Sequence, residues 1–219
     1  MVFLTTVFAV KLCMRNRLSV IYIHGFNSSP VSFKAQQLRK AWLQLGLAEE
    51  NLQIPALHHH PKRAIEQLQE RIEQLPQPVL IGSSLGGYYA TYLAEQYHLK
   101  ALLINPAVRP HHLFDGFLAE QENLYTGERW CLTESHLHGL AALEVPSPSD
   151  AERFCVWLQT GDETLNYCLA EQYYCGCSVH IEQGGDHSFQ RFVEHLPALF
   201  AFVGLTPSAL QSLDLSAFE

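Results

Sequence analysis

The stretch Val79–Leu93, VLIGSSLGGYYATYL, joins two apolar segments through a serine flanked by glycines. The first segment is short and has no alternating polar positions, which is typical of a strand buried on both faces. The second segment, Leu85–Tyr97, is predicted to be a helix. Ser84 therefore stands at the turn from strand to helix, between Gly82 and Gly86.

The same succession of short apolar runs and helical periodicity continues on both sides of this stretch. Further strands are predicted at 18–24, 52–57, 101–105, 153–159 and 178–182, and further helices at 30–45, 61–75, 166–174 and 190–202. In the helix at 30–45, Ser29 is the predicted cap, Pro30 the first residue, and Phe33 part of the buried face. Strands that are apolar throughout favour a parallel sheet covered on both faces. The predicted fold is α/β, with a doubly wound and mostly parallel sheet.

The chain of 219 residues is predicted to form one main domain, at 18–203. An excursion at 106–152, rich in aromatic residues, leucine and histidine, is expected to act as a small cap that roofs the site or lines an acyl pocket. The tail at 204–219 is expected to be loosely held.

The N-terminal extension, 1–17, opens on an apolar run that is too short to span a bilayer. Its positive charges follow that run, the reverse of a secretory signal. A natural start at Met14 rather than Met1 is therefore favoured, and no membrane span is expected.

Charge and cysteine content bear on nucleic-acid binding and on the cellular compartment of the protein. The formal net charge is -8 and the 14 Lys and Arg residues are scattered, so nucleic acid is not an expected partner. The six cysteines form no disulfide framework or zinc-type spacing, which favours a reduced, cytoplasmic protein. The sequence does not indicate an oligomeric state.

Chemistry-bearing residues follow the predicted strands. Ligands of such sheets bind beyond the carboxyl ends of the strands. Ser84 follows one strand, Asp162 a later one and His187 the last. That chain order, together with G-x-S-x-G between strand and helix, marks the nucleophile elbow of α/β-hydrolases.

The chemistry explains why these residue types are needed. A serine hydroxyl is a poor nucleophile, so His187 has to take its proton while Asp162 orients the imidazole and balances its charge. The backbone N–H groups of Leu85 and Phe26 are the predicted donors to the oxyanion. Two residues before Phe26, His24 is expected to shape the oxyanion loop, to which Gly25 also belongs.

Several longer motifs carry a family resemblance. YIHGFNSSP (22–30), GSSLGGYYAT (82–91), INPAVRP (104–110), QTGDETLNY (159–167) and GGDHSFQRF (184–192) resemble the successive motifs of bacterial YqiA-type esterases, α/β-hydrolases related to the YcfP proteins. The similarity extends from about Leu18 to Phe202. It implies carboxylesterase activity on simple acyl esters without metal or organic cofactor, with Ser84 as nucleophile, Asp162 as acid and His187 as base. The compact size of the chain favours short acyl chains. The sequence departs from the pattern before Leu18, which has no counterpart, and at Asp186, where the family pattern has asparagine.

Other interpretations of the same residues stay open at this point. Glu163 and Asp186 compete with Asp162 for the acid role, and the glycines around Ser84 could serve a turn without chemistry. The run His58–His60 is expected to be an exposed loop near the mouth of the site, because no acidic or cysteine residue accompanies it at metal-ligand spacing. The same triad would also suit a thioesterase or acyltransferase, and an idle triad would leave a binding module.

Overall fold

A computed structural model describes residues 18–114, 116 and 118–218. The extension at 1–17, and with it the choice between Met1 and Met14, lies outside the described residues. Six strands form one sheet in the order β2-β1-β3-β4-β7-β8, and every neighbouring pair is parallel. The strands are β1 (Val20–Ile23), β2 (Leu52–Gln53), β3 (Val79–Ser83), β4 (Ala101–Ile104), β7 (Phe154–Gln159) and β8 (Ser178–Glu182). The predicted α/β fold class is confirmed.

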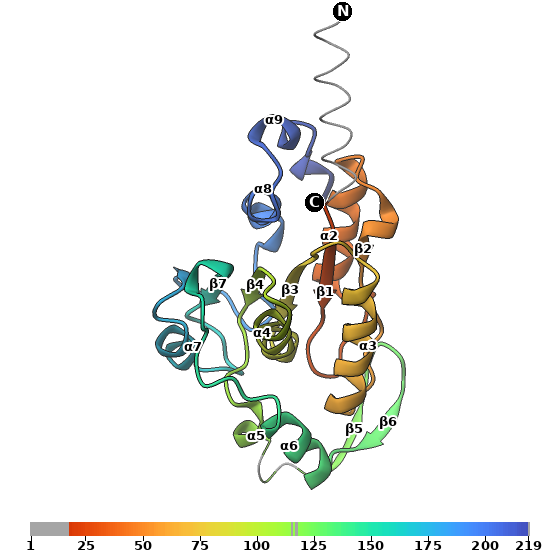
Figure 1. Cartoon of the computed structure of the whole chain (residues 1–219), viewed down its shortest axis with the longest axis vertical. Helices are drawn as coiled ribbons and strands as arrows, with labels where there is room; N and C mark the ends of the chain where they lie inside the picture. Colours follow the sequence, from red (N-terminus) through yellow and green to blue (C-terminus); the bar gives the residue numbers. More distant parts are fainter. Residues whose placement is uncertain (1–17, 115, 117, 219) are drawn as a thin grey trace, which may run out of the picture.

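Helices cover both faces of this sheet (Figure 1). Alternate side chains of a strand point to opposite faces, so Ile21 and Ile23 join one apolar cluster while Val20 and Tyr22 join another. The first cluster is completed by α3 (Pro61–Glu73), α4 (Leu85–Tyr97) and α7 (Tyr167–Tyr173), and the second by α2 (Phe33–Gln44) and α8 (Phe192–Val203). In the described residues, no helix is both long and apolar enough to cross a membrane.

Helix α2 begins three residues later than the sequence predicts. Ser29 and Ser32 close a turn instead, in which the Ser32 N–H donates to the Ser29 carbonyl at 3.1 Å. The Ser29 hydroxyl accepts the Val31 N–H at 3.2 Å, so it caps this turn and not the helix. Phe33 then starts the helix on its outer side and is 72% exposed. Its predicted place in the core was therefore wrong.

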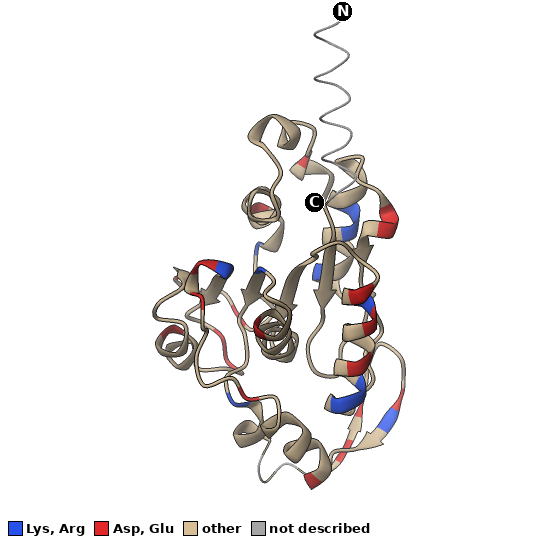
Figure 2. Cartoon of the chain, in the orientation of Figure 1, with Lys and Arg blue, Asp and Glu red and all other residues tan. Residues whose placement is uncertain are grey.

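The excursion contains two short helices and a hairpin. These are α5 (Pro110–Leu113), the antiparallel strands β5 (Glu120–Glu122) and β6 (Arg129–Cys131), and α6 (Glu134–Ala141). They gather at the end of the molecule opposite α9 (Pro207–Leu210), with α6 packed against α3 (Figure 1). Basic and acidic residues are interspersed on α3 and on the hairpin (Figure 2).

The C-terminal tail is held against the domain. The Lys40 ammonium of α2 donates to the Ala217 carbonyl at 2.5 Å and lies 5.0 Å from the centre of the Phe218 ring. Leu213 and Leu215 pack against the apolar cluster under α2 and α8. The expectation of a loosely held tail was wrong for the described part, because these apolar side chains leave water on packing.

Candidate active site

Ser84 occupies the sharp turn between β3 and α4. Its backbone has φ 56° and ψ -123°, a strained conformation for a residue with a side chain. Gly82 and Gly86 permit this turn. A Cβ at Gly86 would lie 2.0 Å from the Ile23 carbonyl oxygen, and one at Gly82 would lie 2.4 Å from the Gly86 carbonyl oxygen. The elbow thus requires glycine at both positions.

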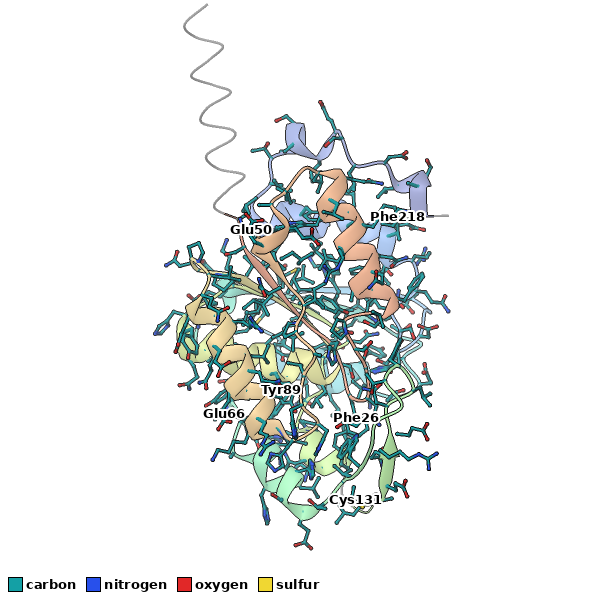
Figure 3. All side chains as sticks on the ribbon, turned by 90° about the vertical axis from the view of Figure 1, so that its right-hand side faces the viewer. Phe26, Glu50, Glu66, Tyr89, Cys131 and Phe218 are labelled. Atoms are coloured by element: carbon teal, nitrogen blue, oxygen red, sulfur yellow. The ribbon has the colours of Figure 1, made fainter. Side chains whose placement is uncertain are left out.

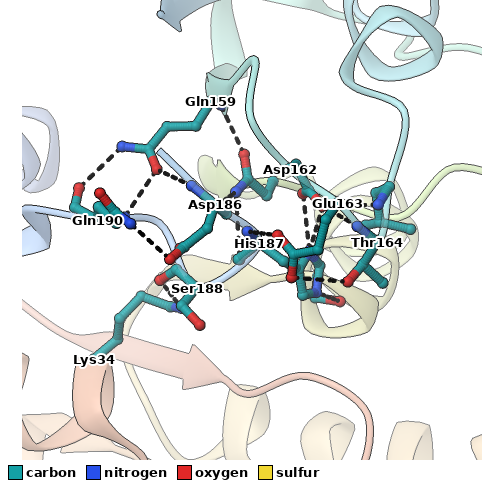
Figure 4. A network of polar contacts seen from close by, with 12 residues as sticks. Lys34, Gln159, Asp162, Glu163, Thr164, Asp186, His187, Ser188 and Gln190 are labelled. Carbon is teal, nitrogen blue, oxygen red and sulfur yellow. Dashed lines mark hydrogen bonds and ion pairs between the residues drawn. The ribbon is translucent and has the colours of Figure 1, made fainter. Parts of the chain in front are cut away.

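The structure brings Ser84, His187 and Asp162 together. His187 Nε2 lies 3.0 Å from Ser84 Oγ, and His187 Nδ1 lies 2.8 Å from Asp162 Oδ2. The Asp162 side chain is 1% exposed, whereas that of His187 is 23% exposed. The backbone N–H groups of Thr164 and Leu165 donate to Asp162 Oδ1 at 2.9 and 2.7 Å, which fixes the orientation of the carboxylate (Figure 4).

The two other candidate acids have different partners. Glu163 accepts the backbone N–H of His187 at 3.0 Å, and the pKa of Glu163 is lowered first by its own backbone N–H and then by that of His187. Asp186 accepts a bond from the Gln190 side chain at 2.9 Å. The imidazole therefore contacts the Asp162 carboxylate, as Figure 4 shows.

Two buried amides hold the loop that carries His187. Asn105, at the end of β4, donates to the carbonyls of Asp186 and His187 at 3.0 and 3.4 Å. Gln159, at the end of β7 and 0% exposed, accepts the N–H groups of Asp186 and Gln190 at 3.2 and 2.8 Å. Sequence reasoning missed the role of Gln159, although a polar residue ending a fully apolar strand is a usable signal.

The predicted oxyanion loop lies directly against Ser84. A Cβ at Gly25 would lie 3.1 Å from the Ser84 Cβ. His24 is buried, and its Nε2 accepts the Leu57 N–H at 3.4 Å while its Nδ1 lies 3.1 Å from the Gly25 carbonyl. This arrangement assigns the ring proton to Nδ1, and burial lowers the pKa of His24.

The two predicted oxyanion donors are available for a ligand. In the described residues, the Phe26 N–H has no protein acceptor. Leu85 is the first residue of α4, where an N–H has no acceptor within the helix. Leu85 directly follows Ser84 in the chain, and Phe26 lines the same cleft as Ser84. Their role as oxyanion donors stays a prediction.

The histidine run His58–His60 differs from its prediction. Instead of forming an exposed loop, these rings pack together and against His136 of α6. The rings of His58 and His59 are 4.2 Å apart, and His59 Nδ1 lies 3.1 Å from His136 Nε2. His136 is buried, and burial followed by the charges of the neighbouring histidines lowers its pKa to about 4. Among the described residues, no group of three or more His, Cys, Asp or Glu is arranged to hold a metal ion.

A cleft of about 250 Å³ opens over Ser84 and His187. Phe33 and Tyr125 stand at its rim, and both are more than half exposed. Lys34 also lines it and donates to the Ser188 carbonyl at 2.7 Å (Figure 4). Burial lowers the pKa of Lys34 to about 8, against the opposing effect of Asp186. The cleft therefore combines a serine hydroxyl, an imidazole, apolar rim side chains and a lysine.

Comparison with solved structures identifies the fold of the chain. A putative hydrolase from Agrobacterium vitis S4 superposes with a TM-score of 0.69 at 17% identity, covering 86% of this chain and 89% of that one. Est1E from Butyrivibrio proteoclasticus, solved with ferulic acid bound, superposes with a TM-score of 0.66 at 13% identity, covering 86% and 87%. The fold is that of the α/β-hydrolases.

Comparison with protein sequences identifies the family. The YcfP protein of Escherichia coli O9:H4 is 23% identical over 192 residues, covering 84% of this chain and 97% of that protein. A protein of Shewanella oneidensis is 23% identical over 195 residues, covering 84% and 98%. The predicted relation to the YcfP proteins is confirmed. The model of an uncharacterised protein family, UPF0227, matches residues 19–204, and the chain therefore belongs to that family.

Proposed function

We propose that the protein is a serine carboxylesterase that hydrolyses simple acyl esters, with Ser84 as nucleophile, His187 as general base and Asp162 as the acid that supports it. The observation that carries this proposal is the pair of contacts from the His187 ring, 3.0 Å to Ser84 Oγ and 2.8 Å to Asp162 Oδ2. These distances suit proton transfer from the hydroxyl to the imidazole.

The reaction would proceed through an acyl-enzyme. Ser84 Oγ attacks the ester carbonyl as its proton passes to His187 Nε2, and the tetrahedral oxyanion accepts the N–H groups of Phe26 and Leu85. Collapse of this intermediate breaks the bond to the alcohol, which leaves with the proton held by His187. Water then gives a proton to His187 and attacks the acyl carbon. The bond from that carbon to Ser84 Oγ breaks as His187 returns the proton to this oxygen, which releases the acid and restores the Ser84 hydroxyl.

The burial of Asp162 gives it a specific role in this cycle. Its carboxylate lies in contact with the imidazole and is removed from water, so it stabilises the imidazolium more than an exposed acid would. Its two backbone donors keep it from turning away. Proteins of the same fold include Est1E and the lipolytic enzymes LipS and LipT, which supports an ester as the substrate class.

The compact cleft supports small substrates. A volume of about 250 Å³ accommodates the acyl and alcohol parts of a short ester, while a long acyl chain would extend past the exposed rim residues Phe33 and Tyr125. We therefore propose short-chain esters as the preferred class.

Hydrolysis of a short-chain 4-nitrophenyl ester tests the proposal. The wild-type protein should release nitrophenolate, and Ser84→Ala should lose this activity, while the neighbouring variant Ser83→Ala should keep most of it. A fluorophosphonate probe should label Ser84 in the folded protein. Activity that survives in Ser84→Ala would refute the assignment. Thioesters of the same acyl chain, tested in parallel, separate an esterase from a thioesterase.

A further inference from the structure

The hairpin of the excursion is bound to the oxyanion loop through the side chain of Asn27. The Trp130 indole N–H of β6 donates to Asn27 Oδ1 at 3.1 Å, and Asn27 Nδ2 donates to Gln121 Oε1 of β5 at 3.3 Å. A third bond runs from Asn123 Nδ2 to the Ser28 carbonyl at 2.9 Å. Both strands of the hairpin thus hold the residues that directly follow Phe26.

Aromatic contacts hold the side chain of Phe26 itself. Its ring centre lies 4.7 Å from that of Phe114 and 5.6 Å from that of Trp130, the latter in an edge-on arrangement. Phe26 lies where the main domain meets the excursion (Figure 3). The Phe26 backbone N–H, which has no acceptor in the part of the chain that the structure describes, therefore belongs to a residue whose side chain the excursion holds in place.

The backbone of the loop needs such support. Asn27 has φ 48°, in the left-handed region that residues with a side chain adopt at a cost. The orientation of the Phe26 peptide depends on the conformation of this segment, and an unsupported loop could relax away from it. The two bonds to the Asn27 side chain favour the observed conformation.

The hairpin is in turn tied to the main domain. The His59 ring stacks on Trp130 with centres 4.6 Å apart and an interplanar angle of 15°. His59 also meets His136 of α6, and the His60 ring meets Ser135 at 3.1 Å. Trp130 therefore lies between the main domain at His59 and the oxyanion loop at Asn27, and is 9% exposed.

From these contacts we propose that Asn27 is a positioning residue for the oxyanion donor at Phe26, and that the excursion is a fixed support for the oxyanion loop. This inference rests on the proposed esterase function. A donor stabilises the oxyanion only from about 2.7–3.1 Å. A small displacement of the loop therefore reduces the stabilisation of the transition state more than it reduces the binding of the substrate.

Two variants test the inference with little disturbance of the fold. Asn27→Gly removes both side-chain bonds and suits the left-handed backbone. Trp130→Phe keeps an aromatic ring and removes the indole N–H. In each, kcat per fluorophosphonate-titrated site should fall about 10- to 100-fold, since a full oxyanion donor is worth about 10²–10³. KM should change less than about threefold, because ground-state binding uses the donor little.

Binding of a transition-state analogue gives a second measurement, because a general loss of stability would not change the affinity of the folded protein for it. Affinity for a trifluoromethyl ketone, which forms a tetrahedral adduct with Ser84, should fall in parallel with kcat/KM. Asn27→Asp, which keeps the acceptor for Trp130, should recover part of the loss. Trp42→Phe is the matched control, because it loses an indole bond to the Ala48 carbonyl in the core, away from the loop.

Three outcomes decide the inference. A selective fall in kcat and analogue affinity, absent from Trp42→Phe, supports it. Unchanged kcat and analogue affinity in Asn27→Gly and Trp130→Phe overturn it, while the esterase proposal stands if Ser84→Ala is inactive. A wild-type protein without Ser84-dependent hydrolysis would overturn both. Because kcat is expressed per titrated active site, unfolded molecules in a variant sample do not lower the measured kcat.

Discussion

The contact between His136 and the histidine run makes the stability of the protein sensitive to mild acid. The pKa of His136 falls from 6.5 to about 4 in the folded protein, with burial as the largest cause and His60 and His59 next. On lowering the pH, the unfolded chain takes up a proton near the ordinary pKa while the folded chain does not. The free energy of unfolding therefore decreases as the pH falls from about 6.5 towards about 4.

The pKa difference sets the size of this effect. At about pH 5, proton uptake at this site shifts the folding equilibrium towards the unfolded chain by a factor of about 30, which corresponds to a loss of about 2 kcal/mol relative to about pH 7.5. The groups that face the His136 ring are His59 and His60, preceding α3, and Trp130 and Thr133 of the excursion. Arg63 and Glu128 also act on the histidine run. Of the charged groups that affect the pKa of His58 and His59, only Glu128 favours protonation.

Urea unfolding at about pH 7.5 and about pH 5 measures the effect. The variant His136→Gln keeps a side chain that forms hydrogen bonds and removes the titrating group. We expect it to be less stable than wild type at about pH 7.5, and to lose about 2 kcal/mol less than wild type on acidification. Equal losses in the two proteins would refute the reasoning, because the other histidines are the same in both.

Three further predictions follow from the site. Asp162→Asn should lower kcat by about 10³- to 10⁴-fold with KM nearly unchanged, because the imidazolium loses its buried partner; steady-state ester kinetics measure this, and a loss below about tenfold would contradict it. Gly86→Ala should prevent stable folding, because the added Cβ would clash with the Ile23 carbonyl. Gly176→Ala is the control and should fold normally, because the nearest atom to its added Cβ lies at 3.8 Å. Circular dichroism measures the folding of both variants. Gln159→Leu should cost about 2–4 kcal/mol in urea unfolding, since it leaves buried N–H groups of the His187 loop without an acceptor; wild-type stability would show that the loop has other support.

The sequence was sufficient for the sheet and for the strand-end residues. Parallel strands bring their carboxyl ends to one edge, so the chain order of Ser84, Asp162 and His187 was enough to predict that they meet. The fold class and the relation to YcfP proteins are confirmed. The catalytic roles of the three residues remain predictions for the assays above.

Other features depended on contacts that a linear pattern does not reveal. The start of α2 shifted because the Ser29 side chain bonded locally within a turn, which competes with helix formation. The contact of His59 with His136 spans 77 positions, and no periodicity links the two. Strands β5 and β6 are three residues each and mostly exposed, so they lack the apolar signal that marked the sheet strands.

The connection between β4 and β7 is a place where chain length can change without rearranging the sheet. These strands are direct neighbours in the sheet, with Ile104 paired to Trp157, and the excursion occupies the crossover between them. A crossover between adjacent strands can lengthen or shorten without altering strand order or register, and loop length has a small entropic cost. A change in this segment would leave the elbow and the histidine loop in place, but it would remove the support that Trp130 and Gln121 give to Asn27.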